Sequence, residues 1–503
     1  MSRARSAVPL ALPIAVLALL GGLLLAACGR PARAEAGSTA PPLFETLGDL
    51  HRDIGTPVPA AQRYFDQGLR LAYGCQHEAA RRSFSEAQRL DPDCAMCAWG
   101  QALVLGPTID QAMAEELAAD ATALADRALR LRDKARPADR ELIDALARRY
   151  ATPAPDDRGP LDLAYAEAMA GAAQRHPDDD DIATLYAEAL MLLSPRAYWH
   201  ADGRPTEHTG RIVATLERVL QRSPGHLGAV RYYLHAFEAS RDPQRAEPHA
   251  DRLAALAPGA SYLVHLPAHI YLRTGRYHDA TQSNLAAASA DDALVAVCCG
   301  SDGMDESDLT AGGDAVDIDD GNDHGSVGQR PALAAHYWHF AAMSAGLHGS
   351  RAQAIEAAEQ AARRAEPAHL QAHPGVQQWV VAPLFAQLRF GQWHAILAPA
   401  DAPAALPYPR GIWHFARGMA LLRQGKPAAA QRELRALQAL TADPALQEAE
   451  LPDINRADRV LEVAVAMLRG ELALGRGQRK AGIAALHAAV VAEDRLSYNA
   501  PPD

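Results

Sequence analysis

The residues of this sequence best suited to chemistry are histidines that recur three or four positions apart. Among the 20 histidines, His265 and His269 are four apart and His336 and His339 are three apart. Side chains at these spacings share one face of a helix and can converge on one ion. Imidazole suits Zn, Cu, Fe or Ni, and a nearby carboxylate can complete such a set. The candidate metal ligands are His235, Glu238, His265, His269, His336 and His339.

The elements that must position these side chains are helix pairs that repeat about every 34 residues. The segment from Tyr64 to Pro92 matches the tetratricopeptide pattern at Gly68, Leu71, Ala80, Phe84, Ala87 and Pro92. Small residues let two helices approach closely, Phe84 fills the seam, and Pro92 ends the second helix. Similar spacing recurs to the end of the chain, and it predicts an all-α fold: an α-α superhelix with a concave groove.

The repeat frame brings the histidines into register. A shift of 34 residues superimposes His235 on His269 and Arg231 on His265. We therefore expect three successive helices to present imidazole to the same groove, which Arg231, Tyr232 and Arg273 would also line. The alternative is a groove of neutral histidines that make hydrogen bonds to neighbouring tyrosines, without any metal.

A second chemical motif is Cys94-Ala95-Met96-Cys97, which opens the helix after Pro92. Two cysteines three apart at a helix start can form a short disulfide, and the helix dipole lowers a thiol pKa there. A structural disulfide is the interpretation we favour for an exported chain. A redox or metal role for Cys94 and Cys97 is the alternative.

The first 28 residues read as an export signal. Arg3 and Arg5 precede an uncharged apolar run from Pro9 to Leu25, and Leu25-Ala26-Ala27-Cys28 resembles the bacterial lipoprotein box. We predict that residues 1–28 are a lipoprotein signal peptide and lipobox, cut before a lipid-modified Cys28, with a flexible tether over 29–43. An ordinary signal peptide, cut after Ala32-Arg33-Ala34, is the alternative.

The remaining chain divides at an acidic stretch. Residues 300–330 are dense in Asp, Gly and Ser and nearly lack large apolar residues, so we predict a disordered loop there. It separates helical repeats over 44–299 from helical repeats over 331–503.

Composition and missing motifs exclude several classes of function. Acidic residues outnumber Lys and Arg by 61 to 49, which argues against a nucleic-acid partner. Six cysteines in 503 residues are too few for a disulfide scaffold. The sequence contains no Gly-x-Ser-x-Gly elbow, no phosphate-binding loop and no His-Glu-x-x-His. We therefore predict no catalytic residue, and the sequence does not favour an enzyme.

Three blocks carry a family resemblance: YFDQGLRLAYGCQHEAARRSFSEAQRLDPDCAMCAWG from Tyr64 to Gly100, VHLPAHIYLRTGRYHDATQSN from Val264 to Asn284, and HYWHFA from His336 to Ala341. Together they resemble a group of exported bacterial tetratricopeptide-repeat proteins of unassigned activity. The resemblance implies the fold, the groove and recurrent His and Cys positions, and it names no substrate. The chain departs from that group at Arg231, where relatives tend to have His, and in the acidic stretch. It also ends soon after Pro502, where relatives continue with another helix pair.

Two functions follow. The first is a scaffold that faces the periplasm and is attached to the membrane by its N-terminal lipid. Its groove binds a protein or peptide of the cell envelope. The second is a metal-binding protein or metalloenzyme that uses the histidine cluster with a transition metal.

Overall fold

The structure is a computed structural model, and it describes residues 40–200, 202–300, 330–365, 370, 374–399, 401–402, 404–451 and 455–496, with no side-chain account of 295–300 and 330–332. The chain divides into two units, Met1–Ala40 and Pro41–Asp503, and the account below concerns the second. The predicted signal peptide with Cys28 and most of the tether lie outside the described residues.

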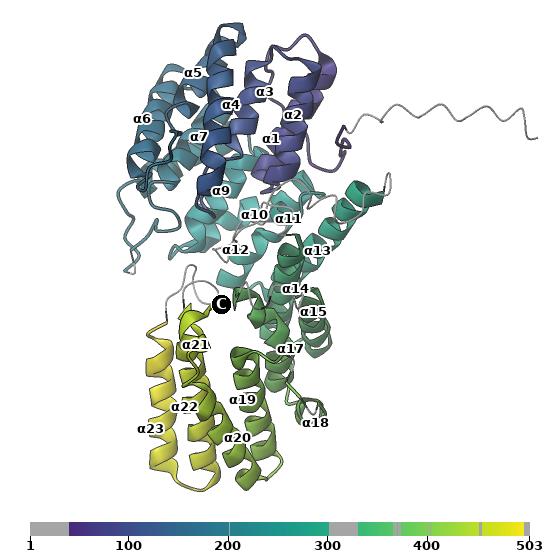
Figure 1. Cartoon of the computed structure of the whole chain (residues 1–503), viewed down its shortest axis with the longest axis vertical. Helices are drawn as coiled ribbons and strands as arrows, with labels where there is room; N and C mark the ends of the chain where they lie inside the picture. Colours follow the sequence, from purple (N-terminus) through teal and green to yellow (C-terminus); the bar gives the residue numbers. More distant parts are fainter. Residues whose placement is uncertain are drawn as a thin grey trace, which may run out of the picture. The chain divides into compact units, whose positions relative to one another are not determined.

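Regular structure in the described residues is almost entirely helical (Figure 1). The first helices are α1 (Pro59–Tyr73), α2 (His77–Leu90), α3 (Ala95–Leu103), α4 (Ala118–Leu131), α5 (Pro137–Leu146), α6 (Gly159–Arg175), α7 (Asp180–Met191), α8 (Thr209–Arg222) and α9 (Leu227–Glu238). They are followed by α10 (Glu247–Leu256), α11 (Ser261–His265), α12 (Pro267–Arg273), α13 (Tyr277–Gly300), α14 (Arg330–Leu347) and α15 (Arg351–Arg364).

The C-terminal part continues in the same way. Its helices are α17 (Gln377–Arg389), α18 (Trp393–Leu397), α19 (Pro407–Arg423), α20 (Pro427–Leu440), α21 (Ala445–Glu448), α22 (Ala457–Gly475) and α23 (Arg479–Glu493). Short 3-10 turns are η1 (Glu115–Leu117), η2 (Arg132–Lys134), η3 (Pro243–Ala246) and η5 (Pro374–Val376). Two short antiparallel strands, β1 (Glu450–Leu451) and β2 (Asn455–Arg456), pair Glu450 with Arg456 and Leu451 with Asn455.

The first predicted repeat packs as its sequence requires. The Phe84 ring of α2 lies against Gly68 of α1 and Gly100 of α3, and a Cβ at either glycine would stand 2.6 Å from a ring carbon. Such a distance is too short for a side chain, so only glycine admits the aromatic ring here. Phe84 is fully buried, and it joins α1 to the helix that opens the next repeat.

The turns inside the helix pairs share one backbone conformation. Gly275, Gly349, Gly425 and Gly477 have φ of 78°, 85°, 72° and 75°, the left-handed region that glycine adopts without steric cost. Cys75 occupies the equivalent turn after α1 with φ of 57°. The first repeat therefore places a buried thiol where later repeats place glycine.

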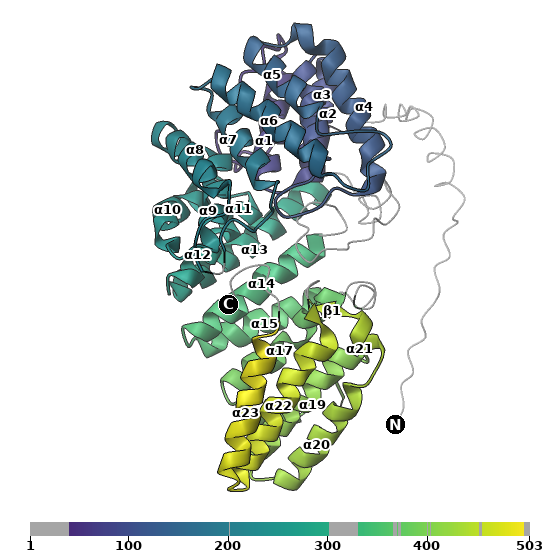
Figure 2. The same ribbon diagram turned by 90° about the vertical axis from the view of Figure 1, so that its left-hand side faces the viewer.

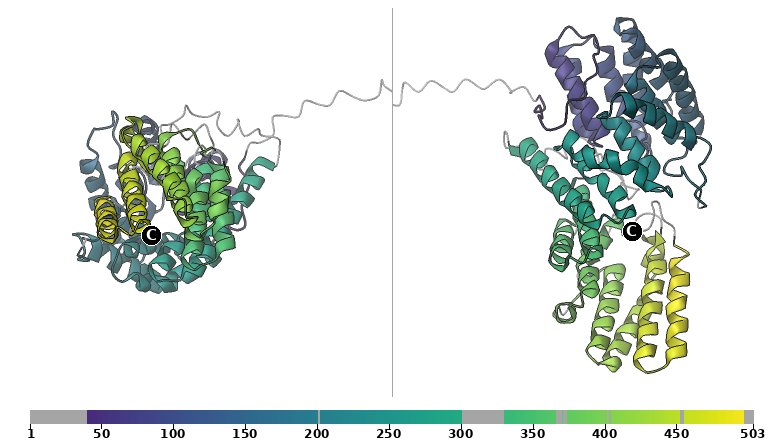
Figure 3. Two further views of the ribbon diagram at one scale, coloured as in Figure 1. Left: turned by 90° about the horizontal axis from the view of Figure 1, so that it is seen from below. Right: turned by 180° about the vertical axis from the view of Figure 1, so that it is seen from behind.

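Consecutive helices pack on one another to build the core. The largest apolar cluster runs from Leu47 to Phe340, and a second runs from Val381 to Leu472. The α22–α23 pair lies beside α19 and α20 (Figures 1 and 2), and Figure 3 shows the same helices from below and from behind. The predicted all-α fold, an α-α superhelix of tetratricopeptide-type helix pairs, is confirmed.

Two local features bear on the predicted site. Pro267 has no N–H to donate to the preceding turn, and it separates α11 from α12 between His265 and His269. The predicted acidic loop falls between Gly300, where α13 ends, and Arg330, where α14 begins, outside the described residues. Within the part of the chain that the structure describes, no helix combines the length and apolar character needed to span a bilayer.

Candidate metal centre

Three of the predicted histidines converge. His265 ends α11, His269 lies in α12 and His336 lies in α14. His265 is fully buried, and the other two side chains are half-buried. One ring nitrogen from each lies within 4.8 Å of the others, and the described residues hold no second group of His, Cys, Asp or Glu of this kind.

The distances between the ring nitrogens match those of ligands to one ion. His265 Nε2 lies 2.9 Å from His269 Nε2 and 3.3 Å from His336 Nε2. Nitrogens bound at about 2.05 Å to one tetrahedral zinc lie about 3.3 Å from each other. His265 thus stands near ligand separation from both other imidazoles, and the three nitrogens all lie within 4.8 Å of one another.

The orientation of His265 is set by an amide on α13. Asn284 is fully buried, and its Nδ2 donates to the Ala280 carbonyl at 2.8 Å. Its Oδ1 is therefore left to accept the Nδ1–H of His265 at 2.6 Å. This hydrogen bond assigns the neutral tautomer of His265 in which Nε2 carries the lone pair.

The orientation of His269 is set by a carboxylate on α9. Glu238 Oε1 lies 2.7 Å from His269 Nδ1, and a carboxylate can only accept. Nδ1 of His269 is therefore the donor, and its Nε2 carries a lone pair in the neutral ring and a proton in the charged ring. Metal-bound imidazoles usually donate their second nitrogen in this way to a carboxylate or to another oxygen acceptor.

These two assignments leave like groups facing each other. The Nε2 atoms of His265 and His269 lie 2.9 Å apart, at hydrogen-bond distance. A bond between them needs an additional proton, and a metal ion can replace that proton by accepting both lone pairs. Either a proton or a metal ion can therefore lie between these two nitrogens.

An aromatic ring packs against all three imidazoles. The Phe340 ring centroid lies 5.2 Å from that of His265, 4.9 Å from that of His269 and 5.1 Å from that of His336. Phe340 is itself 7% exposed. It restricts the rotation of the rings and covers one side of the cluster with apolar surface.

Beyond Glu238 a buried polar network leads to the N-terminal repeats. The other carboxylate oxygen of Glu238 is 3.6 Å from His235 Nδ1, and His235 Nε2 is 2.9 Å from the Tyr262 hydroxyl. Burial lowers the pKa of His235, and the charges of Asp110 and Glu238 oppose that effect. The imidazole is therefore suited to pass a hydrogen bond in its neutral form.

The network ends at Asp110, whose side chain is 4% exposed in the loop after α3. Its carboxylate accepts from Arg196 at 2.6 Å, from Arg231 at 2.8 Å and from the Tyr262 hydroxyl at 3.4 Å. Side chains from three other segments of the chain thus meet at one buried carboxylate.

Three predicted ligands take other places. Glu238 holds the Nδ1 atom of His269 and is not grouped with the Nε2 atoms, because α9 reaches the imidazole from its far side. His235 contacts Glu238 and Tyr262 in the network. His339 is not part of the group, since a side chain three positions after His336 can share a face without reaching the same point.

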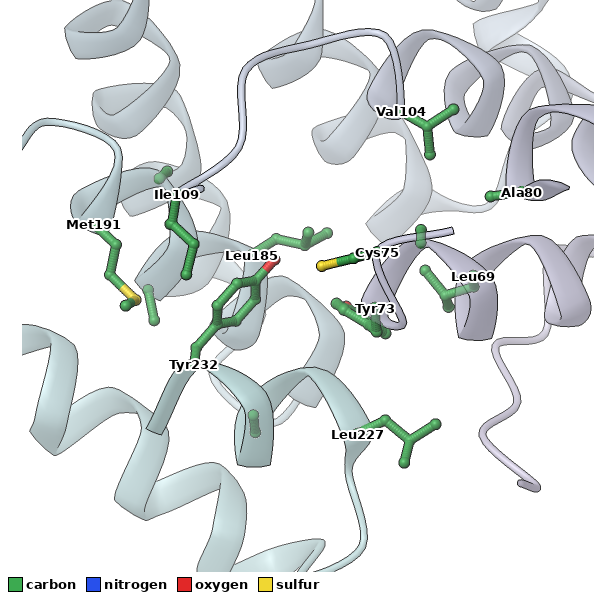
Figure 4. Packing of buried hydrophobic residues seen from close by; sticks show 14 of the residues in the cluster. Leu69, Tyr73, Cys75, Ala80, Val104, Ile109, Leu185, Met191, Leu227 and Tyr232 are labelled. Carbon is green, nitrogen blue, oxygen red and sulfur yellow. The ribbon is translucent and has the colours of Figure 1, made fainter. Parts of the chain in front are cut away.

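The three predicted groove-lining residues lie in different environments. Arg231 and Tyr232 are 2% and 3% exposed, because the loop after α3 inserts Ile109 and Asp110 against them. Figure 4 shows Tyr232 among Ile109, Leu185 and Cys75. Arg273 is exposed and donates to the Ser240 carbonyl at 3.1 Å. Arg231 and Tyr232 are thus interior residues in this structure.

Cys94 and Cys97 are joined in a disulfide. The pair is buried at the start of α3, where the Cys97 N–H donates to Cys94 Sγ. The favoured structural interpretation fits this placement, since buried sulfurs are poorly accessible to exchange partners.

The sequence prediction missed Asn284, Asp110, Arg196 and Phe340. Asn284 had a usable signal, because it lies four positions after Ala280 and three before Ala287, on the face that the repeat makes apolar. A polar residue on such a face needs a partner. Asp110 and Arg196 lie in irregular loops, where spacing carries no information on neighbours.

Comparisons with known proteins identify no family for this chain. No family model matches it. No curated protein matches it either. Among solved structures, human IFIT1 dimer with m7Gppp-AAAA is 11% identical, covers 87% of this chain and 91% of its own, and has a TM-score of 0.35.

Two other repeat structures are similar at the same level. Yeast Tom70 is 11% identical with a TM-score of 0.25, and it covers 86% of this chain and 89% of its own. The P58(IPK) TPR domain is 12% identical with a TM-score of 0.21, covering 86% and 98%. These values are too low for any of the three to indicate what this chain binds.

Proposed function

We propose that this protein binds a transition-metal ion through the Nε2 atoms of His265, His269 and His336. The observation that carries the proposal is the convergence of the Nε2 atoms of the pair His265 and His269 at 2.9 Å, with His336 Nε2 at 3.3 Å from the former. Asn284 and Glu238 hold the other nitrogens of that pair as the outer shell of a metal site does.

Three protein ligands are typical of a site that keeps a coordination position open. Structural zinc sites are closed by four protein ligands, whereas catalytic sites use three and add water or substrate. His269 has 18% of its side chain exposed, so the cluster is accessible from one side while Phe340 covers another. The proposed ion is therefore open to exchange and to a further ligand.

The test is elemental analysis of the full exported chain, purified without a metal-binding tag. We expect near-stoichiometric Zn, Cu, Fe or Ni in the wild type and none in the His265→Ala/His269→Ala double variant. His414→Ala is the matched control, because His414 is also held by a glutamate but stands apart from other histidines. It should retain the metal of the wild type.

Two results would contradict the proposal. One is a wild-type protein that stays free of metal after incubation with each of the four ions and dialysis. The other is a double variant that folds, by circular dichroism, and still retains metal at the wild-type ratio.

We also propose a cellular location and a second role, and both proposals come from the sequence. The segment 1–28 supports export with a lipid on Cys28, and repeat solenoids offer extended surfaces on which other proteins bind. In this proposal the protein is a periplasm-facing scaffold for an envelope protein or peptide. The burial of Arg231 and Tyr232 directs such a partner to other surfaces.

Fractionation and crosslinking test this second role. Cys28→Ala should release the protein from the membrane fraction, and a variant that stays firmly bound would contradict the lipid anchor. Crosslinking in intact cells should capture one envelope protein reproducibly in the presence of a chelator. Absence of any captured partner would count against the scaffold and leave the metal proposal standing.

A further inference from the structure

Residues 41–55, the N-terminal segment, lie against the helical repeats just before α1 begins and form no helix or strand of their own. Arg52 and Ile54 are buried, at 8% and 5% exposed, whereas the alternate residues His51 and Asp53 are exposed. Such alternation is typical of an extended chain that turns every second side chain toward a surface. This part of the segment therefore lies on the repeats as a bound peptide does.

Two glutamines of α1 hold the backbone of the N-terminal segment in the same way. Gln67 donates through Nε2 to the Pro42 carbonyl at 2.9 Å and accepts the Phe44 N–H at 2.8 Å. Gln62 donates through Nε2 to the Arg52 carbonyl at 2.8 Å and accepts the N–H two positions further on at 3.1 Å. Each side-chain amide thus uses its donor and its acceptor on main-chain groups, which any extended peptide offers.

The Arg52 side chain is bound by three carboxylates from two other helices. Its Nε and Nη2 donate to Asp139 Oδ1 of α5 at 3.1 and 2.7 Å. Its Nη1 donates at 3.0 Å to Asp179, which caps α7, and at 2.9 Å to Asp181 in the first turn of α7. Asp181 also lies 3.1 Å from Nε2 of His226. These carboxylates match the planar guanidinium fork, so they add side-chain selectivity to the backbone contacts.

The middle of the N-terminal segment is fixed by an apolar side chain and a tight turn. Leu47 is 1% exposed and belongs to the largest apolar cluster. Gly48 has φ of 87°, and a Cβ there would stand 2.4 Å from the Leu256 carbonyl oxygen. The Gly259 N–H, between α10 and α11, donates to the Thr46 carbonyl at 2.8 Å. The segment is therefore held by side chains or backbone of α1, α5, α7 and the α10–α11 turn.

We propose that this surface is a peptide-binding site and that the N-terminal segment is its resident ligand. The site takes an extended peptide with an arginine in the place of Arg52 and an apolar residue two positions later. This inference deepens the proposed scaffold role, on which only the identity of an outside partner rests, and it does not depend on the metal. The attached segment is present at an effective concentration on the order of millimolar, which keeps other peptides out until it is released.

The experiment uses the full chain with a protease site inserted between Gly55, which is exposed, and Thr56. A fluorescein-labelled peptide of residues 41–55 is titrated into the protein before and after cleavage, and fluorescence anisotropy measures binding. We expect saturable binding after cleavage. Binding before cleavage should be at least about tenfold weaker, because the attached segment competes for the same site.

Three variant peptides test what the site recognises. The Arg52→Gln peptide loses charged hydrogen bonds to the three carboxylates, so it should bind the cleaved protein at least about tenfold more weakly. The Arg52→Lys peptide keeps the charge without the fork and should lie between the two. Glu45→Gln is the matched control, because it also removes one charge but at an exposed position, and it should bind as the wild-type peptide does.

Three results would overturn the inference. One is cleaved protein that keeps its circular dichroism spectrum and binds no peptide. Another is equal affinity for the wild-type and Arg52→Gln peptides. The third is unfolding on cleavage, since the segment would then be part of the fold and not a ligand. Peptide exchange without any captured envelope protein would instead remove the scaffold role and leave this site standing.

Discussion

Two regions of this molecule each orient an imidazole through a glutamate, but they differ in what surrounds the rest of the ring. In the N-terminal repeats, His269 Nδ1 lies 2.7 Å from Glu238 Oε1. In the C-terminal repeats, His414 Nδ1 lies 2.6 Å from Glu433 Oε2. Each pair joins neighbouring helical repeats or helices, and each is mostly shielded from solvent, with side-chain exposures of 18% for His269 and 16% for His414.

The difference lies at the other ring nitrogen. His269 Nε2 faces His265 Nε2, with His336 nearby. The His414 ring instead meets Trp413 edge to face at 4.9 Å, and Arg417 lies over that Trp413. A helix pair can therefore orient one imidazole by itself. A metal site requires further helices to bring their imidazoles to the same point.

The largest effect that would separate the two regions is stabilisation by metal. Ions that bind only the folded chain stabilise it by about 4 kcal/mol at a free concentration about 1,000 times the Kd. We expect this gain in urea unfolding of chelator-treated wild type and of His414→Ala. His269→Ala should gain nothing, and an equal gain in that variant would place the ion elsewhere.

Replacement of the two glutamates should give the second-largest difference between the regions, in metal affinity. Glu238→Gln keeps the shape but removes the charge behind His269, and we expect a 10- to 100-fold loss of metal affinity. Glu433→Gln makes the same chemical change behind His414 and should leave the affinity unchanged. Competition with a chromophoric chelator measures both, and equal affinities for the two variants would show that Glu238 does not support a ligand.

A smaller loss is expected at the neutral support of His265. Asn284→Ala removes the acceptor of the Nδ1–H and should weaken metal binding by about tenfold, the lower end of such outer-shell effects. Asn284→Asp, which restores an acceptor and adds charge, should recover the loss. Recovery is the readout that distinguishes ligand orientation from simple damage to the core, and an Asp variant as weak as Ala would refute the assignment.

The smallest effect is the pH dependence of the C-terminal pair. Burial raises the pKa of Glu433, but the hydrogen bond and charge of His414 and the charge of Arg417 bring it below its usual value. A depressed carboxyl pKa adds stability above the unfolded value, about 4.3, and loses it as pH falls through the folded value.

The pair is partly exposed, so its contribution should stay below about 1 kcal/mol. Urea unfolding at pH 7 and pH 3.5 should show wild type more stable than Glu433→Gln at the higher pH, with the difference shrinking at the lower. A difference that grows on acidification would have the wrong sign for this explanation.

Prediction from sequence succeeded where local spacing decides the outcome. The positions of Gly68 and Phe84 require a close helix pair, and the four-residue spacing of His265 and His269 requires one face. The disulfide between Cys94 and Cys97 is equally local. In each case the interacting groups are separated by few residues or by one repeat.

Prediction from sequence gave less where contacts depend on the path of irregular segments and on the approach of distant helices. Glu238 has the right chemistry for a ligand, but the approach of α9 directs it to Nδ1 of His269. Arg231 has the repeat position of a groove residue, but the loop that carries Asp110 covers it. No periodic pattern predicts the path of a loop, because loop conformation is set by long-range partners.

The sequence by itself thus determined the helix pairs, their order and the spacing of the histidines, since these follow from side-chain periodicity and helix geometry. Only the tertiary structure decided which nitrogens meet. His265, His269 and Asn284 acquire their roles because α11 and α12 pack against α13 and α13 packs against α14, which brings His336 across 71 residues of sequence. The physical reason is that a hydrogen bond or metal contact depends on tenths of an ångström, and those are set by the packing of whole helices.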